Sequence, residues 1–165
     1  MKTLLLIRHA KSSWQDAHLV RDIDRSLKDR GIIDAINMAT RIEQKQIIPQ
    51  KIMSSDGIRA LHTAIIFARK LHVKCDKIEI DNLLYHCEVS DIESVICSQN
   101  SNISTFAIFC HNPSINEFAS KYIPNFYENV PTCGVLCFSS DIDNWSDFSS
   151  KNANLLWFDY PKKVK

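Results

Sequence analysis

The feature that most constrains the fold of this chain is an uninterrupted aliphatic run, Leu4–Ile7, which is followed at once by Arg8 and His9. A short apolar run that ends in polar residues is typical of a strand buried on both faces. The segment Ser104–Cys110 has the same character. Because a strand buried on both faces needs a cover on each side, we expect a sheet with helices on both faces.

Segments with helical spacing of apolar residues alternate with these strands. The expected helices span residues 27–46, 58–71, 91–99 and 113–122. The expected strands span residues 2–8, 51–54, 78–80, 104–110, 134–139 and 154–159. The alternation predicts an α/β fold: a three-layer α/β/α sandwich around a mostly parallel central sheet, in a single domain over residues 1–165. The last two strands have a short connection, which favours an antiparallel edge strand.

Finer expectations concern how the helices begin and pack. Ser90 is expected to cap the helix over 91–99. Pro113 lies near the first turn of its helix, where proline is tolerated. In the helix over 58–71, the helical spacing predicts an inward face made of Ile58, Leu61, Ile65 and Ala68.

The charge balance argues against several classes of partner. The chain has 20 Lys and Arg against 19 Asp and Glu, so no excess charge favours nucleic acid or a membrane surface. No apolar run has the length of a membrane-spanning helix, and the apolar part of Met1–Ile7 is too short for a secretory signal. The six cysteines lack metal-ligand spacing, so reduced thiols are expected. We expect a cytoplasmic monomer.

Basic residues follow the strands at three strand-to-helix junctions. Arg8 and His9 end the first strand, Arg59 lies in the first turn of the helix after the second strand, and His111 directly follows the long apolar strand. In an open parallel sheet, ligands bind where the strands end at their carboxyl edge. If these strands are neighbours, the four side chains converge on one site.

These residue types suit phosphoryl transfer. Two arginines can bind a phosphate and neutralise the charge on its oxygens. A histidine between them has a lowered pKa, because nearby cations disfavour its protonated form, and so stays neutral and nucleophilic. His111 can donate to a phosphate oxygen. This chemistry needs no metal and the sequence has no acidic cluster to hold one, so we expect no metal and no cofactor.

Taken together, the motifs resemble those of the histidine phosphatase superfamily, specifically its small SixA-type phosphohistidine phosphatases. The motifs are Arg8-His9-Ala10-Lys11-Ser12-Ser13-Trp14, Asp24-Arg25 with Leu27 and Gly31, Ser54-Ser55 through Arg59-Ala60 to Thr63-Ala64, His111-Asn112-Pro113 and Pro131-Thr132-Cys133-Gly134. They cover nearly the whole chain in order. The resemblance implies a phosphoglycerate mutase-like fold.

The resemblance also implies roles for single residues. His9 is the expected nucleophile that becomes phosphohistidine, and Arg8, Arg59 and His111 are expected to form the phosphate pocket. Ser12, by its offset from His9, is expected to add a hydrogen bond to phosphate or substrate. Lys11, Arg25 and Trp14 lie near the site and are expected at its rim, where Lys11 and Arg25 bind substrate.

Two departures from the family pattern bear on the chemistry. Lys28 stands where related sequences often have a helix-capping Ser, Thr or Asn, which can shift the start of the first long helix. No motif marks the carboxylate general acid of the larger family members, and the candidates are Glu79 and Glu88, which precede the long apolar strand. A site without an acid suits phosphohistidine or activated esters, because an alkoxide leaving group needs a positioned proton donor whereas an imidazole can leave protonated.

Three functions stay open at this point. The first is a metal-independent phosphatase for phosphohistidine on a protein, with a role in signal transduction. The second is a phosphatase for a small phosphomonoester; a mutase is disfavoured because the chain is short and lacks enclosing insertions. The third is a weakly catalytic phosphate-binding module, against which the intact set Arg8, His9, Arg59 and His111 argues. An open pocket without a lid favours the first.

Overall fold

The computed structural model describes residues 1–15 and 18–163, and in them six strands form one sheet in the order β3-β2-β4-β1-β5-β6. The strands are β1 (Lys2–Arg8), β2 (Lys51–Ser54), β3 (Ile78–Ile80), β4 (Thr105–Cys110), β5 (Val135–Ser140) and β6 (Ala153–Asp159). The first four run parallel, β5 runs antiparallel to β1, and β6 pairs antiparallel with β5. The predicted fold class is confirmed, with the reversed strand β5 inside the sheet and β6 at its edge.

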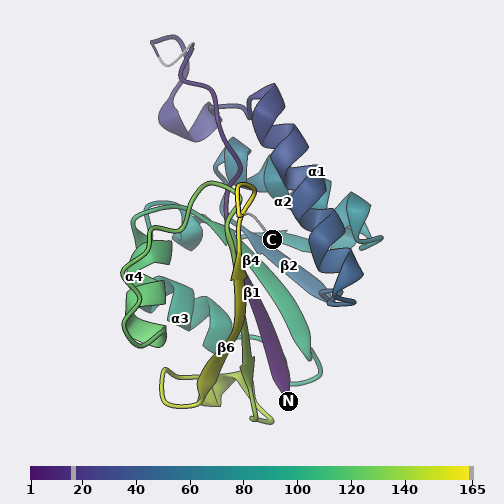
Figure 1. The fold of residues 1–165 in the computed structure, drawn as a ribbon, viewed down its shortest axis with the longest axis vertical. Coiled ribbons are helices and arrows are strands. Elements are labelled where there is room, and N and C mark those ends of the chain that lie inside the picture. The colour runs from purple at the N-terminus through teal and green to yellow at the C-terminus, as the bar shows by residue number, and fades with distance from the viewer. Residues whose placement is uncertain (16–17, 164–165) are drawn as a thin grey trace.

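Helices cover both faces of this sheet, as Figure 1 shows. The helices α1 (Asp29–Gln44) and α2 (Ile58–Lys70) lie on one face, and α3 (Val89–Cys97) and α4 (Ser114–Tyr122) lie on the other. Four short 3₁₀ helices complete the described part: η1 (Asp22–Asp24), η2 (Cys75–Lys77), η3 (Asn82–Leu84) and η4 (Trp145–Asp147). No helix of the described residues is long and apolar enough to cross a membrane.

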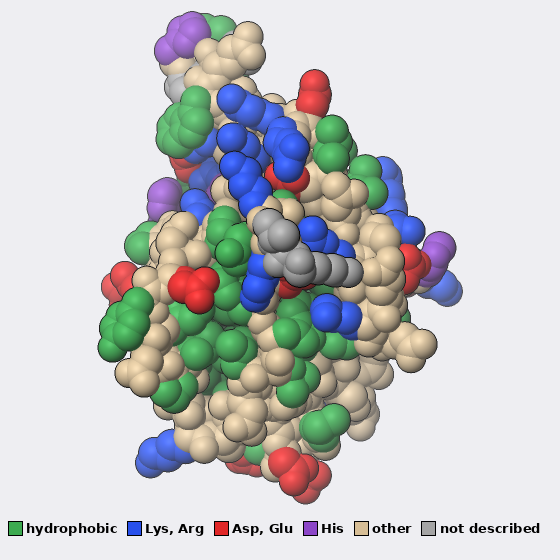
Figure 2. All heavy atoms as spheres, viewed as in Figure 1, with side chains coloured by type: hydrophobic (Ala, Val, Ile, Leu, Met, Phe, Trp, Pro, Cys, Tyr) green, Lys and Arg blue, Asp and Glu red, His purple; other side chains and the backbone are tan. Residues whose placement is uncertain are grey.

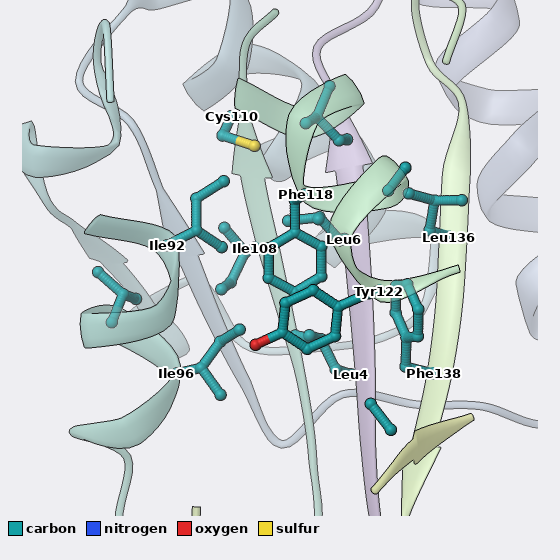
Figure 3. Close-up of a cluster of buried hydrophobic side chains, with 14 of the residues drawn as sticks. Leu4, Leu6, Ile92, Ile96, Ile108, Cys110, Phe118, Tyr122, Leu136 and Phe138 are labelled. Carbon is teal, nitrogen blue, oxygen red and sulfur yellow. The ribbon is translucent and has the colours of Figure 1, made fainter. Parts of the chain in front are cut away.

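The alternation of side chains along β1 divides the core into two layers. Leu4 and Leu6 belong to the cluster under α3 and α4, whereas Leu5 and Ile7 belong to the cluster under α1 and α2. Figure 3 shows the first cluster, in which the rings of Phe118 and Tyr122 stack with their centroids 3.9 Å apart. Since both faces of β1 are buried, its carboxyl end is held rigidly where Arg8 and His9 follow.

The inward face predicted for α2 is only partly confirmed: Ala68 is buried, whereas Leu61 and Ile65 are only partly buried. Ile58 is 41% exposed, while Ala60, Ala64 and Phe67 are buried against the sheet. Apolar residues occur on nearly every side of this helix, so the spacing alone did not select the face. The observed rotation turns Arg59, on the first turn, inward beside the sheet edge.

Two helix starts also differ from the prediction. The α3 helix begins at Val89 rather than Asp91, and Ser90 is not its cap: Asp91 accepts a hydrogen bond from the Glu88 backbone N–H at 2.8 Å. The α1 helix begins at Asp29, two residues later than predicted, because the chain before it is extended: Leu27 forms an isolated β-bridge with Ser12, and the Lys28 N–H donates to the Lys11 carbonyl. The helix over 113–122 is confirmed with its first residue at Ser114.

Candidate active site

The backbone of Arg8 and His9 is fixed from two sides at the carboxyl end of β1. The His9 N–H donates to the Cys110 carbonyl of β4 at 3.1 Å. From the other side, the Cys133 N–H lies 3.1 Å from the Arg8 carbonyl and 3.0 Å from the His9 carbonyl. Cys133 adopts a left-handed conformation with φ 62°, which turns the chain so that this N–H points at β1. The motif that contains Cys133 therefore holds the carboxyl end of β1 in place through this N–H.

The imidazole of His9 is held in one tautomer. Its Nδ1 lies 2.7 Å from the Ala10 carbonyl, which can only accept, so Nδ1 carries the proton and Nε2 keeps a lone pair. Burial, together with the positive charges of Arg59, Arg8 and Arg25, lowers the pKa of His9 to about 3. The ring is therefore neutral at neutral pH, with a nucleophilic atom free.

The turn after His9 is tied to α2. The Ala10 N–H donates to the Thr63 hydroxyl at 3.0 Å, and this hydroxyl donates to the Arg59 carbonyl at 2.6 Å. The side chain of Thr63 is fully buried, so both bonds are shielded from water. This bridge fixes the distance between the turn after His9 and the first turn of α2, where Arg59 lies.

His111 stands beside His9 after β4, and the two ring centroids are 5.1 Å apart. Its Nε2 lies 2.8 Å from the Ser55 hydroxyl, which also accepts from the Gly57 N–H at 3.1 Å. A Cβ on Gly57 would lie 3.0 Å from the His111 ring, so glycine allows this close packing. Burial lowers the pKa of His111 to about 2, with further contributions from His9 and Arg59.

Three buried nitrogens around His9 have no hydrogen-bond partner in the described residues. They are Arg8 Nε, Arg59 Nε and His111 Nδ1. A buried polar atom without a partner costs about 1–3 kcal/mol, and such groups in a folded protein call for an explanation. All three belong to side chains beside His9, and an oxyanion is the kind of acceptor that such cationic and polar donors suit.

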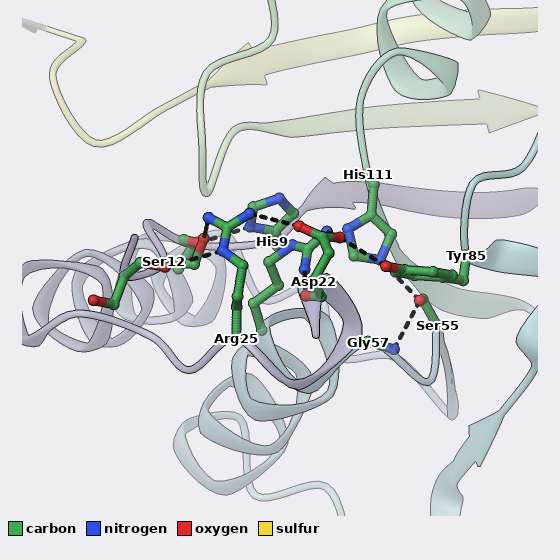
Figure 4. Close-up of polar contacts among 11 residues, drawn as sticks. His9, Ser12, Asp22, Arg25, Ser55, Gly57, Tyr85 and His111 are labelled. Atoms are coloured by element: carbon green, nitrogen blue, oxygen red, sulfur yellow. Dashed lines mark hydrogen bonds and ion pairs between the residues drawn. The ribbon is translucent and has the colours of Figure 1, made fainter. Parts of the chain in front are cut away.

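Asp22, from the 3₁₀ helix η1, joins these groups and was missed by the sequence analysis (Figure 4). Its carboxylate accepts from Arg59 at 2.9 Å, from Arg25 at 2.8 Å and from the Tyr85 hydroxyl at 2.7 Å. Partial burial opposes ionisation, but the hydrogen bonds from Tyr85, Arg25 and Arg59 hold the pKa of Asp22 well below its usual range. Asp22 is therefore an anion that positions two arginines.

The predicted rim residues also lie together. Arg25 donates to the Ser12 hydroxyl at 2.6 Å and to the Ser13 carbonyl at 2.9 Å, and its guanidinium lies 3.3 Å from the centre of the Trp14 ring. These contacts hold the segment after β1 against η1. Lys11 has an exposed side chain, while its carbonyl lies where any Cβ on Gly31 would clash.

A cavity of about 440 Å³ opens over His9. Its size exceeds what a phosphate alone would fill. Its lining comprises Arg8, His9, Lys11, Ser12, Trp14, Arg25, Lys28, Arg30, Asp34, Arg59, Pro131, Thr132, Tyr160, Pro161 and Lys162. All predicted site residues except His111 line it, and His111 packs on His9 beneath. The structure brings the predicted set together, while the role of each residue stays a prediction.

The two carboxylates suggested as a general acid lie elsewhere. Glu79 pairs with Lys51 at 2.8 Å beside the edge strand β3, and Glu88 precedes α3 beside a different surface hollow. Of the described acidic residues, Asp34 lines the cavity, and it is paired with Arg30 at 2.9 Å. No three His, Cys, Asp or Glu side chains gather as a metal site in the described ranges 1–15 and 18–163, and the expectation of no metal stays a prediction.

Comparison with known proteins identifies the family to which this geometry belongs. Residues 4–96 match the model of the histidine phosphatase superfamily, branch 1. The chain belongs to the histidine phosphatase superfamily. It is also 44% identical over 158 residues to an uncharacterized chloroplastic protein of Arabidopsis thaliana, an alignment that covers 88% of this chain and 70% of that protein.

Solved structures show the same histidine phosphatase fold. A protein from Agrobacterium tumefaciens, described as a candidate phosphohistidine phosphatase SixA, matches with a TM-score of 0.81 and 23% identity over 95% of this chain and 96% of that chain. The protein histidine phosphatase SixA in complex with tungstate matches with a TM-score of 0.81 and 17% identity, over 96% and 97% of the two chains. The predicted SixA-type, phosphoglycerate mutase-like architecture is confirmed.

Proposed function

We propose that this histidine phosphatase is a metal-independent enzyme that removes the phosphoryl group from phosphohistidine on a protein, through a phosphorylated His9. One observation carries this proposal. Around an imidazole with a fixed tautomer and a free Nε2, three buried nitrogens of Arg8, Arg59 and His111 are unpaired among the described residues. A phosphoryl group bound there has a nucleophile on one side and hydrogen-bond donors for its oxygens.

In the first step, His9 Nε2 attacks the phosphorus of the substrate. A bond forms between Nε2 and phosphorus, and the bond between phosphorus and the substrate nitrogen breaks. The Ala10 carbonyl accepts from Nδ1–H throughout, so it stabilises the positive charge that the ring gains. Arg8 and Arg59 stabilise the negative charge on the phosphoryl oxygens.

His111 supplies a further donor in this step. With the Ser55 hydroxyl donating to Nε2, the neutral ring carries its proton on Nδ1, the atom that has no partner in the described chain. A phosphoryl oxygen can accept from it. In the second step, water attacks the phosphorus, the bond to His9 Nε2 breaks, and inorganic phosphate leaves.

The leaving group decides the substrate class. Asp22 is kept ionised by Arg59, Arg25 and Tyr85, so its carboxyl has no proton to give. An alkoxide leaves poorly without a positioned acid, whereas an imidazole is a neutral leaving group once it has taken a proton from solvent. Phosphohistidine, or an ester with an activated leaving group, therefore suits this site better than an alkyl phosphate.

The relatives add support of a second kind. The SixA structure with tungstate holds a tetrahedral oxyanion, the shape of the group that we place beside His9. By analogy with that protein histidine phosphatase, the proposed partner is a phosphorylated signalling protein. A location in the cytoplasm stays a prediction, since the Arabidopsis relative is named as chloroplastic.

The test is a parallel assay of four substrate types: a phosphohistidine peptide, p-nitrophenyl phosphate, phosphoserine and a panel of sugar phosphates. Each is measured with wild type, His9→Ala and His62→Ala, with and without a chelator. His62 lies on α2 outside the cavity and serves as the matched control. We expect the phosphohistidine peptide to be preferred, His9→Ala to be inactive, and the chelator to have no effect.

Three results would overturn the proposal. Preference for a sugar phosphate or phosphoserine would assign the chain to small-molecule phosphatases and imply a proton donor other than Asp22. Retention of most activity by His9→Ala would refute the covalent mechanism. Binding of phosphate without turnover of any substrate would favour the phosphate-binding module.

A further inference from the structure

The cavity over His9 has more positive charge than one phosphoryl group requires. Seven of its lining residues are Lys or Arg, and one, Asp34, is acidic. Four of the seven are arginines with partners inside the protein: Arg8 donates to the Val130 carbonyl, Arg25 and Arg59 contact Asp22, and Arg30 pairs with Asp34. The other three are lysines.

These three lysines, which we call the lysine rim, are Lys11, Lys28 and Lys162. They come from three separate segments: the turn after β1, the residue before α1, and the chain after β6. All three are exposed, and none forms an ion pair with a described carboxylate. Figure 2 shows Lys and Arg side chains gathered on one face of the molecule. Like charges around one cavity repel each other, and an anionic ligand would relieve that repulsion.

The segment that forms one wall of the cavity also exposes apolar side chains. Trp14 is 66% exposed and Leu19 is 73% exposed, on the stretch between β1 and α1 that projects from the body of the molecule (Figure 1). A ligand confined to the cavity would leave Leu19 uncovered. A macromolecule that extends past the cavity mouth can cover it, and aromatic residues at such positions often anchor protein partners.

We propose that the substrate is a protein that presents its phosphorylated side chain on an acidic surface, with carboxylates that contact the lysine rim. The inference rests on the proposed function, because it assigns a partner class to the same site. The rim would act outside the reacting group: it brings acidic substrates to His9 and holds them, and takes no part in bond making. Its effect should therefore fall as salt screens the charges.

The test uses three phosphohistidine peptides of equal length whose four flanking positions are glutamate, glutamine or lysine. An exposed ion pair has a modest effect, about twofold for each lysine, so three pairs give an expected preference of about fivefold to tenfold in kcat/KM for the acidic over the neutral peptide at low salt. We expect this ratio to approach one in high salt. Lys28→Gln and Lys162→Gln should each lower the ratio by about twofold, and Lys28→Glu with Lys162→Glu should bring it below one.

The matched control is Lys151→Gln, an exposed lysine between β5 and β6 that does not line the cavity, and it should keep the wild-type ratio. Equal kcat/KM for the acidic and neutral peptides would overturn the inference and leave the proposed function intact. A higher rate on the lysine-flanked peptide would also overturn it. If no phosphohistidine peptide is hydrolysed while p-nitrophenyl phosphate is, the proposed function fails and the inference fails with it.

Discussion

The bottom of the cavity and its mouth are built in opposite ways. At the bottom, His9 and His111 are buried, their backbones follow central strands, and backbone hydrogen bonds with Cys110 of β4 and with Cys133 hold His9 in place. At the mouth, Lys11 and Lys28 are exposed and lie on irregular segments. The sheet topology therefore positions the groups proposed for the chemistry, while the connecting segments carry the residues proposed to select the substrate.

The same contrast explains what could be predicted from the sequence. Arg8, His9 and His111 each directly follow a long apolar run, so the strand pattern alone places them at one edge of the sheet. Asp22 and Tyr85 come from 3₁₀ turns, where no periodicity exists to predict a position. For Asp22 the available signal was its place three residues before Arg25, a spacing at which opposite charges can pair.

The predicted inward face of α2 and the predicted start of α1 differ from the structure for a related reason. Apolar residues surround α2, so the inward face is decided by how the helix packs between β2 and α1, which a single sequence does not state. The start of α1 depends on the Lys28 N–H reaching the Lys11 carbonyl, a contact between the two sides of the segment after β1. Such long-range contacts override the local capping preference.

The largest expected effect is on catalysis, and it distinguishes an arginine at the cavity from another arginine on the same helix, α2. Arg59→Ala should reduce kcat/KM by about 100-fold or more, comparable to the loss of roughly 3 kcal/mol when one charge-stabilising donor is removed. The matched variant Arg69→Ala changes an exposed arginine at the last turn of α2 and should keep activity. Similar rates for both variants in steady-state assays would mean that Arg59 does not contact the transferred group.

The next effect is on stability and concerns the close packing of Gly31 in α1 against the backbone of Lys11 at the mouth of the cavity. A Cβ on Gly31 would clash with the Lys11 carbonyl oxygen, so Gly31→Ala forces the backbone apart. We expect the free energy of unfolding to fall by about 1–3 kcal/mol, as for other overpacked sites. Urea denaturation measures this change, with Asn37→Ala at an exposed position of α1 as the control. An unchanged free energy of unfolding would show that the segment around Lys11 can shift without cost.

A smaller effect on stability tests the carboxylate of Asp22, which connects Arg59 at the bottom of the cavity to Arg25 at its mouth. Because the pKa of Asp22 is lowered in the folded state, its contacts stabilise the protein above the unfolded-state pKa of about 3.9 and are lost as the pH falls below it. Asp22→Asn should lower Tm by about 1–3 °C at pH 7, since Asp22 is largely solvent-screened. The difference should shrink as the pH falls from 4 toward 2. A difference that is constant with pH would argue against a charge effect.

The smallest expected effect is an absence of titration. Burial and neighbouring cations lower the pKa of His9 to about 3, and burial lowers that of His111 to about 2, so neither ring should take up a proton between pH 8 and pH 5. NMR shifts of the two imidazoles report this directly, with His9→Ala and His111→Ala used for assignment. A titration of His9 near pH 6.5 would show that its ring is open to water.

The central claim is that His9 Nε2 carries the phosphoryl group during turnover. The most direct measurement is to mix the enzyme with a phosphohistidine peptide, quench under alkali within one turnover, and locate the phosphoryl group by mass spectrometry of the digested protein. The account predicts a phosphorylated peptide that contains His9, formed and lost at rates that match turnover and absent in His9→Ala. Turnover with no phosphoenzyme, or with the phosphoryl group on another residue, would contradict it.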